Sequence, residues 1–123
     1  MAISLTIAEA AEASGVSAHT LRYYEREGVL DPVTRAGNGH RRYGERELEW
    51  IRFLTKLRST GMPIRQIRAY ADLYRRGDAT HPDRLALLEA HRESVRAQLA
   101  ETERALELID RKIHYYRERL AAR

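Results

Sequence analysis

Residues 14–25, SGVSAHTLRYYE, decide the fold of this 123-residue chain. Gly15 tolerates the left-handed dihedral angles that a tight turn between two helices needs. Ser17 can cap the helix that follows, which we expect to run from about residue 18 to residue 26 and to stop at Gly28. The stretch therefore predicts a helix-turn-helix, in which the second helix presents side chains to the major groove of DNA.

A capping box places the helix that precedes this turn. In residues 6–9, TIAE, the Thr6 hydroxyl and the Glu9 carboxylate can each satisfy a backbone N–H of an opening helical turn, so a helix should begin near Thr6. Ile7, Ala10 and Ala11 then recur at helical spacing. Ala11 is small, which lets a second helix cross close to it.

The second helix has an apolar face and a polar face. We expect Val16 and Leu21, with part of Tyr24, to be buried. The side chains expected to be more exposed are His19, Thr20, Arg22, Tyr23 and Arg26. Arginine in such a position can read guanine edges, and tyrosine can meet a phosphate or a thymine methyl group. The alternative is an ordinary corner of two helices with a basic surface.

A hairpin signal follows the two helices. Asn38 and Gly39 are typical of a tight hairpin turn, and they are flanked by residues 33–35, VTR, and residues 40–43, HRRY. We interpret the segment as a small β-hairpin wing, whose arginines can hold phosphates on either side of the groove. The alternative is a solvated, charged hairpin.

The linked motifs resemble one family. Residues 6–43 and two further stretches, LEWIRFL at 48–54 and LRSTGMPI at 57–64, are similar to the MerR family of bacterial transcriptional regulators. The resemblance implies a mainly α fold, with a winged helix-turn-helix domain over residues 1–77 and a dimerisation helix over residues 81–121. From the helix pattern and the resemblance together we predict that DNA is bound by Ser17, His19, Thr20, Arg22, Tyr23, Tyr24, Arg41, Arg42, Tyr43 and Arg58.

Two apolar patterns predict the next helices. From residue 45 to about residue 59 an apolar stripe should supply the core, and it consists of Leu48, Ile51, Leu54 and Leu57. Trp50 and Phe53 broaden this stripe. Gly61 ends the helix and Pro63 can open the next one. The side chains that the next helix should turn toward the core are Ile64, Ile67, Tyr70, Ala71 and Tyr74.

The resemblance implies that this helix pair forms a second wing against the DNA backbone. Arg58 would contact a phosphate there, and Arg65 is a further candidate. Four further basic residues of the pair are interpreted as plain surface charge: Lys56, Arg68, Arg75 and Arg76. Gly44 departs from the family, which usually has a hydroxyl residue at the cap of the third helix, but glycine is nearly as good a cap.

The positive charge is concentrated in the middle of the chain. Residues 35–76 contain eleven Arg or Lys and four Asp or Glu, a local balance of +7 in a chain of net charge +4. A basic segment of this kind indicates a polyanionic partner such as DNA. No apolar run approaches a transmembrane length and no signal peptide opens the chain. We therefore expect a soluble cytoplasmic protein that associates with the nucleoid.

The last third of the chain predicts one long helix with a heptad stripe. After Pro82 no further Gly or Pro occurs, and nine of the eleven a and d positions are apolar over five heptads. These nine are Leu85, Leu88, Val95, Leu99, Leu106, Ile109, Ile113, Tyr116 and Leu120. A helix of roughly 60 Å cannot bury such a stripe against the preceding domain, so we predict a coiled-coil homodimer. The resemblance implies that the pairing is antiparallel.

The composition argues against several classes of protein. The chain has no cysteine, so it is not a sensor that uses thiolates to bind a metal or an iron–sulfur cluster or to detect a redox signal. Its five histidines are scattered without a pair at helical spacing, so we predict neither a metal site nor a cofactor. The sequence carries no nucleophile elbow and no phosphate-cradling glycine loop, and we predict that it is not an enzyme.

A small-molecule effector is an open alternative. Six aromatic residues could line a cleft between the fourth helix and the coiled coil: Trp50, Phe53, Tyr70, Tyr74, Tyr115 and Tyr116. The other interpretation is that they pack in the core and in the dimer.

The resemblance also implies a mechanism. A homodimer would bind a pseudo-palindrome in a promoter whose spacer is too long, then bend and untwist the DNA so that RNA polymerase engages both promoter elements. Two other hypotheses remain. One is an architectural DNA-bending protein or recombination directionality factor, and the other is an interaction protein whose coiled coil docks another protein.

Overall fold

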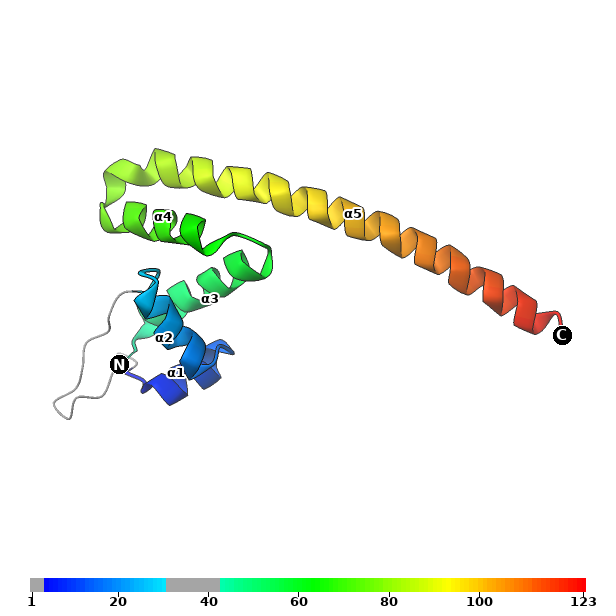
Figure 1. The fold of residues 1–123 in the computed structure, drawn as a ribbon, viewed down its shortest axis with the longest axis horizontal. Helices are drawn as coiled ribbons and strands as arrows, with labels where there is room; N and C mark the ends of the chain where they lie inside the picture. The colour runs from blue at the N-terminus through cyan, green and yellow to red at the C-terminus, as the bar shows by residue number, and fades with distance from the viewer. Residues whose placement is uncertain (1–3, 31–42) are drawn as a thin grey trace. The chain divides into compact units, whose positions relative to one another are not determined.

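The computed structural model describes residues 4–30 and 43–123, and within them the chain is mainly helical (Figure 1). Two compact units are formed, Met1–Leu85 and Ala86–Arg123. The predicted wing lies outside the described residues, except for its last residue, Tyr43. The elements are α1 (Ile7–Ser14), α2 (Ala18–Arg26), α3 (Glu45–Ser59), α4 (Ile64–Arg75), a short 3-10 turn η1 (Asp78–Thr80) and α5 (His81–Ala121).

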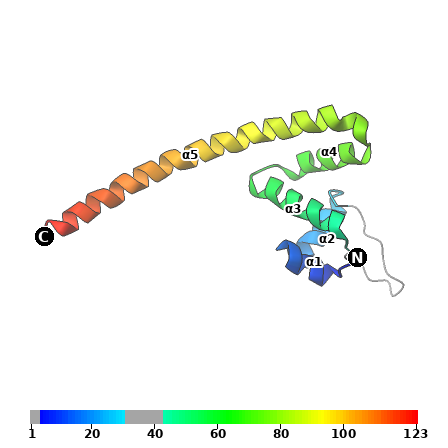
Figure 2. The same ribbon diagram turned by 180° about the vertical axis from the view of Figure 1, so that it is seen from behind.

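The predicted start of α1 and the turn after it are confirmed. The Thr6 N–H donates to Glu9 Oε1 at 2.9 Å, and the Glu9 N–H donates to Thr6 Oγ1 at 3.2 Å. Gly15 has φ 74° and donates its N–H to the Ala11 carbonyl at 2.9 Å. A side chain at this position would be strained, because L residues rarely adopt a positive φ. The turn thus brings α2 back against α1, its immediate neighbour in Figure 2.

Both ends of α2 are capped as the sequence predicts. The Ser17 hydroxyl accepts from the Thr20 N–H at 3.1 Å. At the other end Gly28 has φ 76°, its N–H donates to the Glu25 carbonyl, and the next N–H, of Val29, donates to the Tyr24 carbonyl. This pair of bonds is a Schellman motif, which ends a helix by satisfying its last carbonyls and turning the chain.

The N-terminal unit contains a continuous apolar core. The predicted α3 stripe is confirmed, since its four members are at most 5% exposed: Leu48, Ile51, Leu54 and Leu57. Ile67 and Ala71 of α4 face them, at 0% and 4%. The prediction that Tyr74 faces the core is wrong, because its side chain is 60% exposed; Phe53, which was predicted to broaden the stripe, is 37% exposed. Both lie beside the buried stripe, at the edge of the core.

The connection between α4 and α5 contains the short turn η1, which side-chain hydrogen bonds hold in place. Thr80 in η1 is 8% exposed, and its hydroxyl lies 2.6 Å from the Leu73 carbonyl oxygen and 2.8 Å from that of Gly77. Arg84 donates to the Gly77 carbonyl at 3.1 Å and stacks over the Tyr74 ring. The first turn of α5 therefore belongs to the N-terminal unit. The predicted division into residues 1–77 and 81–121 stays a prediction.

The second unit is the remainder of α5. One long helix is confirmed, and none of its residues is buried. Ion pairs at i,i+3 spacing lie along it, such as Arg96 with Glu93 at 3.1 Å and Arg104 with Glu101 at 2.7 Å. Across residues 4–30 and 43–123, no helix combines the length and the apolar character needed to span a membrane.

Candidate nucleic-acid interface

The polar face of α2 is accessible. Ser17, His19 and Arg22 are exposed, and Thr20 and Tyr23 are half-buried. The opposite face holds Val16 and Leu21, which are 8% and 0% exposed, as predicted. The capping bond of Ser17 and the Schellman motif fix both ends of the helix, so its exposed side chains project from a rigid support.

Two tyrosines of the predicted DNA-binding set lie in the core. Tyr24 is 6% exposed and Tyr43 is 0% exposed. Tyr43 pairs with Leu5 in an antiparallel bridge, in which the two N···O distances are 2.8 and 2.7 Å. The Tyr43 hydroxyl donates to Glu25 Oε1 at 3.0 Å. Both side chains are buried within the protein, and we leave both out of the proposed contacts. Their role in this structure is to anchor α2.

The remaining residues of the predicted DNA-binding set are arginines of the wing and of the α3–α4 pair. Arg41 and Arg42 lie outside the described residues. Arg58 is exposed in the last turn of α3, and Arg65 is exposed in the first turn of α4. The α3–α4 connection thus presents two arginines to solvent, which is the arrangement that phosphate contacts require.

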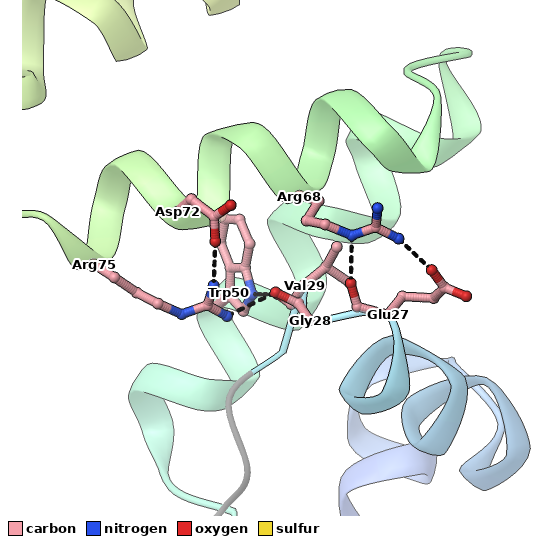
Figure 3. A network of polar contacts seen from close by, with 7 residues as sticks. All are labelled: Glu27, Gly28, Val29, Trp50, Arg68, Asp72 and Arg75. Carbon is pink, nitrogen blue, oxygen red and sulfur yellow. Dashed lines mark hydrogen bonds and ion pairs between the residues drawn. The ribbon is translucent and has the colours of Figure 1, made fainter.

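The interpretation of Arg68 and Arg75 as plain surface charge is wrong, because both contact the turn that ends α2 (Figure 3). Arg68 donates through Nε to the Glu27 carbonyl at 2.7 Å and pairs through Nη2 with the Glu27 carboxylate. Arg75 donates through Nη2 to the Gly28 carbonyl at 2.7 Å and through Nη1 to Asp72 at 2.9 Å. No sequence spacing indicates these contacts, since their partners lie 41 and 47 positions away.

An aromatic cluster lies next to these arginines. The Trp50 ring stacks on those of Tyr70 and Tyr74, with centroids 5.7 and 6.5 Å apart. The Trp50 Nε1–H donates to the Val29 carbonyl at 2.6 Å. Trp50 also lines an open cavity of about 620 Å³ with Phe53 and Tyr74, among other residues. The predicted effector cleft also included Tyr115 and Tyr116, which contact each other in the second unit, and that cleft stays a prediction.

The described residues contain no group of three or more His, Asp or Glu that could hold a metal ion. Among the described histidines, His81 and His114 lie close to carboxylates. His81 Nε2 lies 3.6 Å from Asp78, and His114 Nε2 lies 3.1 Å from Glu118.

Two family models match the chain. The model for the MerR HTH family regulatory protein matches residues 5–73, and the model for MerR DNA binding matches residues 48–112. Together they cover the helix-turn-helix, the α3–α4 pair and most of α5.

Individual relatives agree with the family models. The chain is similar to an uncharacterized HTH-type transcriptional regulator of Haemophilus influenzae, with 40% identity over 114 residues that cover 93% of this chain and 84% of the relative. Its structure is similar to that of HiNmlR, a MerR family regulator lacking the sensor domain, bound to promoter DNA (TM-score 0.86, 39% identity, 94% of this chain and 92% of that one). A MerR family transcriptional regulator from Bacillus thuringiensis aligns with TM-score 0.81 and 30% identity over 90% of this chain and 97% of that one.

The fold and the exposed basic helix thus define a helix-turn-helix regulator. The chain belongs to the MerR family, whose members are DNA-binding transcriptional regulators.

Proposed function

We propose that the chain acts as a homodimer that binds a pseudo-palindromic operator within a promoter and controls transcription there. The observation that carries the proposal is the exposure of His19 and Arg22 on α2, a helix whose other face is buried in the core. A helix anchored in this way can enter the major groove without losing its fold.

The exposed residues suggest a division of roles. Arg22 has the planar, two-pronged geometry that pairs with the O6 and N7 edge of guanine, so it is the proposed base reader. Arg58, at the end of α3, is proposed to contact a phosphate, and Arg41 and Arg42 are proposed to do the same from the wing. Such contacts fix the register of a protein on DNA, and base contacts select the sequence.

Dimerisation is proposed to run along α5. The seam side chains are exposed in the single chain: Leu85 59%, Leu99 57%, Leu106 54%, Ile109 55%, Ile113 42%, Tyr116 57% and Leu120 64%. Leu88 and Val95 are half-buried. A second α5 packed on this row would remove the apolar side chains from water. Burial of apolar surface stabilises by about 25 cal/mol per Å², so the association would be favourable. An antiparallel pair would place two recognition helices on the two halves of a pseudo-palindrome.

The proposed output is a change of DNA shape. A dimer held at both half-sites can bend and untwist the spacer between promoter elements, which costs several kcal/mol that the phosphate contacts must offset. RNA polymerase would then be affected indirectly, through the altered DNA.

The remaining parts of the proposal concern location and chemistry. We propose that the protein works in the cytoplasm, next to the nucleoid, without catalytic activity and without a cofactor. The relatives are regulators, and the exposed polar residues of α2 are accessible for binding. Recognition of a small-molecule effector by this chain would not use thiolates, because the chain has no cysteine.

The test is selection of bound sequences from fragmented genomic DNA by the purified full chain, at one stated salt concentration near physiological. Recovery of one or a few inverted repeats between promoter elements would support the proposal and identify the target gene. Recovery of A·T-rich or bent DNA without a repeat would favour an architectural protein instead. No enrichment at all would contradict DNA regulation and favour a protein partner for the coiled coil.

A further inference from the structure

We propose that Arg68 and Arg75 are positioning residues for DNA recognition, which set the direction of α2 relative to the α3–α4 pair. With Trp50 they form a group that we name the α2 clamp (Figure 3). The inference rests on the proposed function, because it assumes that α2 reads DNA. It deepens that function by assigning the orientation of the reading helix to residues that need not touch DNA.

The α2 clamp donates hydrogen bonds to three consecutive carbonyl groups, those of residues 27–29. Arg68 Nε, Arg75 Nη2 and Trp50 Nε1 donate to them in that order, at 2.7, 2.7 and 2.6 Å. The Schellman motif uses N–H groups of this turn and leaves these carbonyls free to accept from outside. Each of the three carbonyls thus accepts a hydrogen bond from a side chain of α3 or α4. Two of the donors are cations at the negative end of the helix dipole, where they are favoured.

The partial exposure of the two arginine side chains indicates that they affect the orientation of α2 more than the stability of the domain. The side chains of Arg68 and Glu27 are 44% and 32% exposed, and those of Arg75 and Asp72 are 34% and 61% exposed. Ion pairs as accessible as these contribute little to the free energy of unfolding. A planar guanidinium that donates to two acceptors at once nevertheless fixes the angle between the groups it joins. Loss of the clamp should therefore turn α2 without unfolding the domain.

The backbones of α2 and α4 do not approach each other closely. Close approaches between the described helices of the N-terminal unit join α1 to α2, α1 to α3 and α3 to α4, and none joins α2 to α4. The arginines bridge α2 and α4 by their length alone. Because Arg22 on α2 and Arg58 on α3 must reach the same DNA together, the angle that the clamp sets decides whether both contacts form.

The test compares three double variants of the full chain. Arg68→Ala with Arg75→Ala removes the arginine part of the clamp. Lys56→Ala with Arg76→Ala removes the same charge from α3 and from the end of α4, at positions that are exposed. Arg68→Lys with Arg75→Lys keeps the charge and removes the planar fork. Each variant is measured against the selected operator and against random DNA, and the readout is the ratio of the two dissociation constants.

We expect the clamp alanine variant to lose about tenfold in this ratio, which corresponds to about 1.4 kcal/mol. The charge control should change the two dissociation constants by the same factor, if at all, and so keep the ratio, and the lysine variant should restore the ratio only in part. The same ratio for all three variants and the wild type would overturn the inference. If the alanine variant does not fold by circular dichroism, the lysine variant decides the question, because it keeps the charge and the side-chain length.

A second readout works without DNA. The chain has one tryptophan, so its fluorescence reports on the clamp directly. We expect the emission of Trp50 to shift in the clamp alanine variant and to stay unchanged in the charge control. An unchanged emission together with a retained ratio would contradict the inference and leave the proposed function intact. A wild type that prefers no sequence would instead overturn the proposed function, and the inference with it, before any variant is made.

Discussion

The N-terminal unit and the free part of α5 differ in what they bury. Among the residues of the N-terminal unit that the structure describes, fourteen apolar side chains are buried, and they come from α1 to α4 and the segments beside these helices. In α5 no residue is buried, although its seam is as rich in leucine as the core. The difference teaches that one unit has its packing partners within the chain and the other requires a partner from outside. Burial, rather than helix propensity, therefore separates the two regions.

The polar contacts of α5 cannot replace that partner. Its i,i+3 pairs, Arg96 with Glu93 and Arg104 with Glu101, lie on the exposed surface. Each such pair stabilises a helix by about 0.2–0.5 kcal/mol. Burying a single leucine is worth about 1.5–3 kcal/mol, so the apolar seam outweighs the charged face. A second copy of α5 is the proposed partner, since the same seam would then be buried on both sides.

The largest effect is expected from Leu106→Asp. In the proposed dimer this change places an unpaired carboxylate on each side of the seam, and burying such a charge costs far more than one leucine contributes. The dimer should dissociate, which sedimentation at micromolar concentration would detect. Arg111→Gln is the control, because it makes the same change in net charge on the opposite side of the helix. A dimer that survives Leu106→Asp would contradict the heptad assignment and with it the comparison of the two regions.

Two leucine-to-alanine changes sharpen the comparison. Leu54 is 0% exposed in the core of the N-terminal unit, and Leu99 is 57% exposed on α5. Leu54→Ala should lower the free energy of unfolding by about 2–5 kcal/mol and leave the dimer dissociation constant unchanged. Leu99→Ala should raise that constant, because its burial exists only in the dimer. Urea unfolding and sedimentation measure the two quantities, and equal effects of both variants on dimerisation would argue against separate units.

Local signals made much of the fold predictable. The capping box at Thr6, the glycine at residue 15 and the serine at residue 17 act over three or four residues, and all three have the predicted geometry. The stripe of α3 was predictable for a similar reason, because helical periodicity alone decides which of its side chains share a face. The length of α5 followed from the absence of Gly and Pro after Pro82.

Long-range contacts were not predictable. Arg68 and Arg75 look like ordinary surface charge in the sequence, and only the three-dimensional arrangement of α4 brings them to the end of α2. Tyr43 was assigned to DNA with its basic neighbours, yet its pairing with Leu5 directs the ring into the core. Tyr74 shows the opposite error, since helical spacing suited the core but the side chain is 60% exposed. Arg68, Arg75 and Tyr43 each contact a residue that is distant in the sequence, so no local pattern could reveal these contacts.

Arg22→Ala tests the N-terminal unit without disturbing the seam. The side chain is exposed, so the variant should fold and dimerise normally. Operator binding should weaken by about 1–3 kcal/mol, the value of a good bidentate contact to a base, and random DNA should be affected less. Fluorescence anisotropy with both DNAs measures the difference. Equal losses on the two DNAs would contradict base reading by Arg22 and reduce it to a phosphate contact.

The smallest effect is expected from Arg58→Ala, which should weaken binding to the operator and to random DNA alike. One phosphate contact releases about one counterion, so the slope of log K against log salt should fall in magnitude by about 1. Lys56→Ala is the matched control, because Lys56 is exposed on the same helix two positions earlier and is interpreted as plain surface charge. Its slope should stay close to that of the wild type. If both variants lowered the slope equally, the contribution would belong to the general charge of α3 rather than to a contact at its end. If neither did, α3 would not reach the DNA backbone, and the proposed second wing would be reduced to a support for α2.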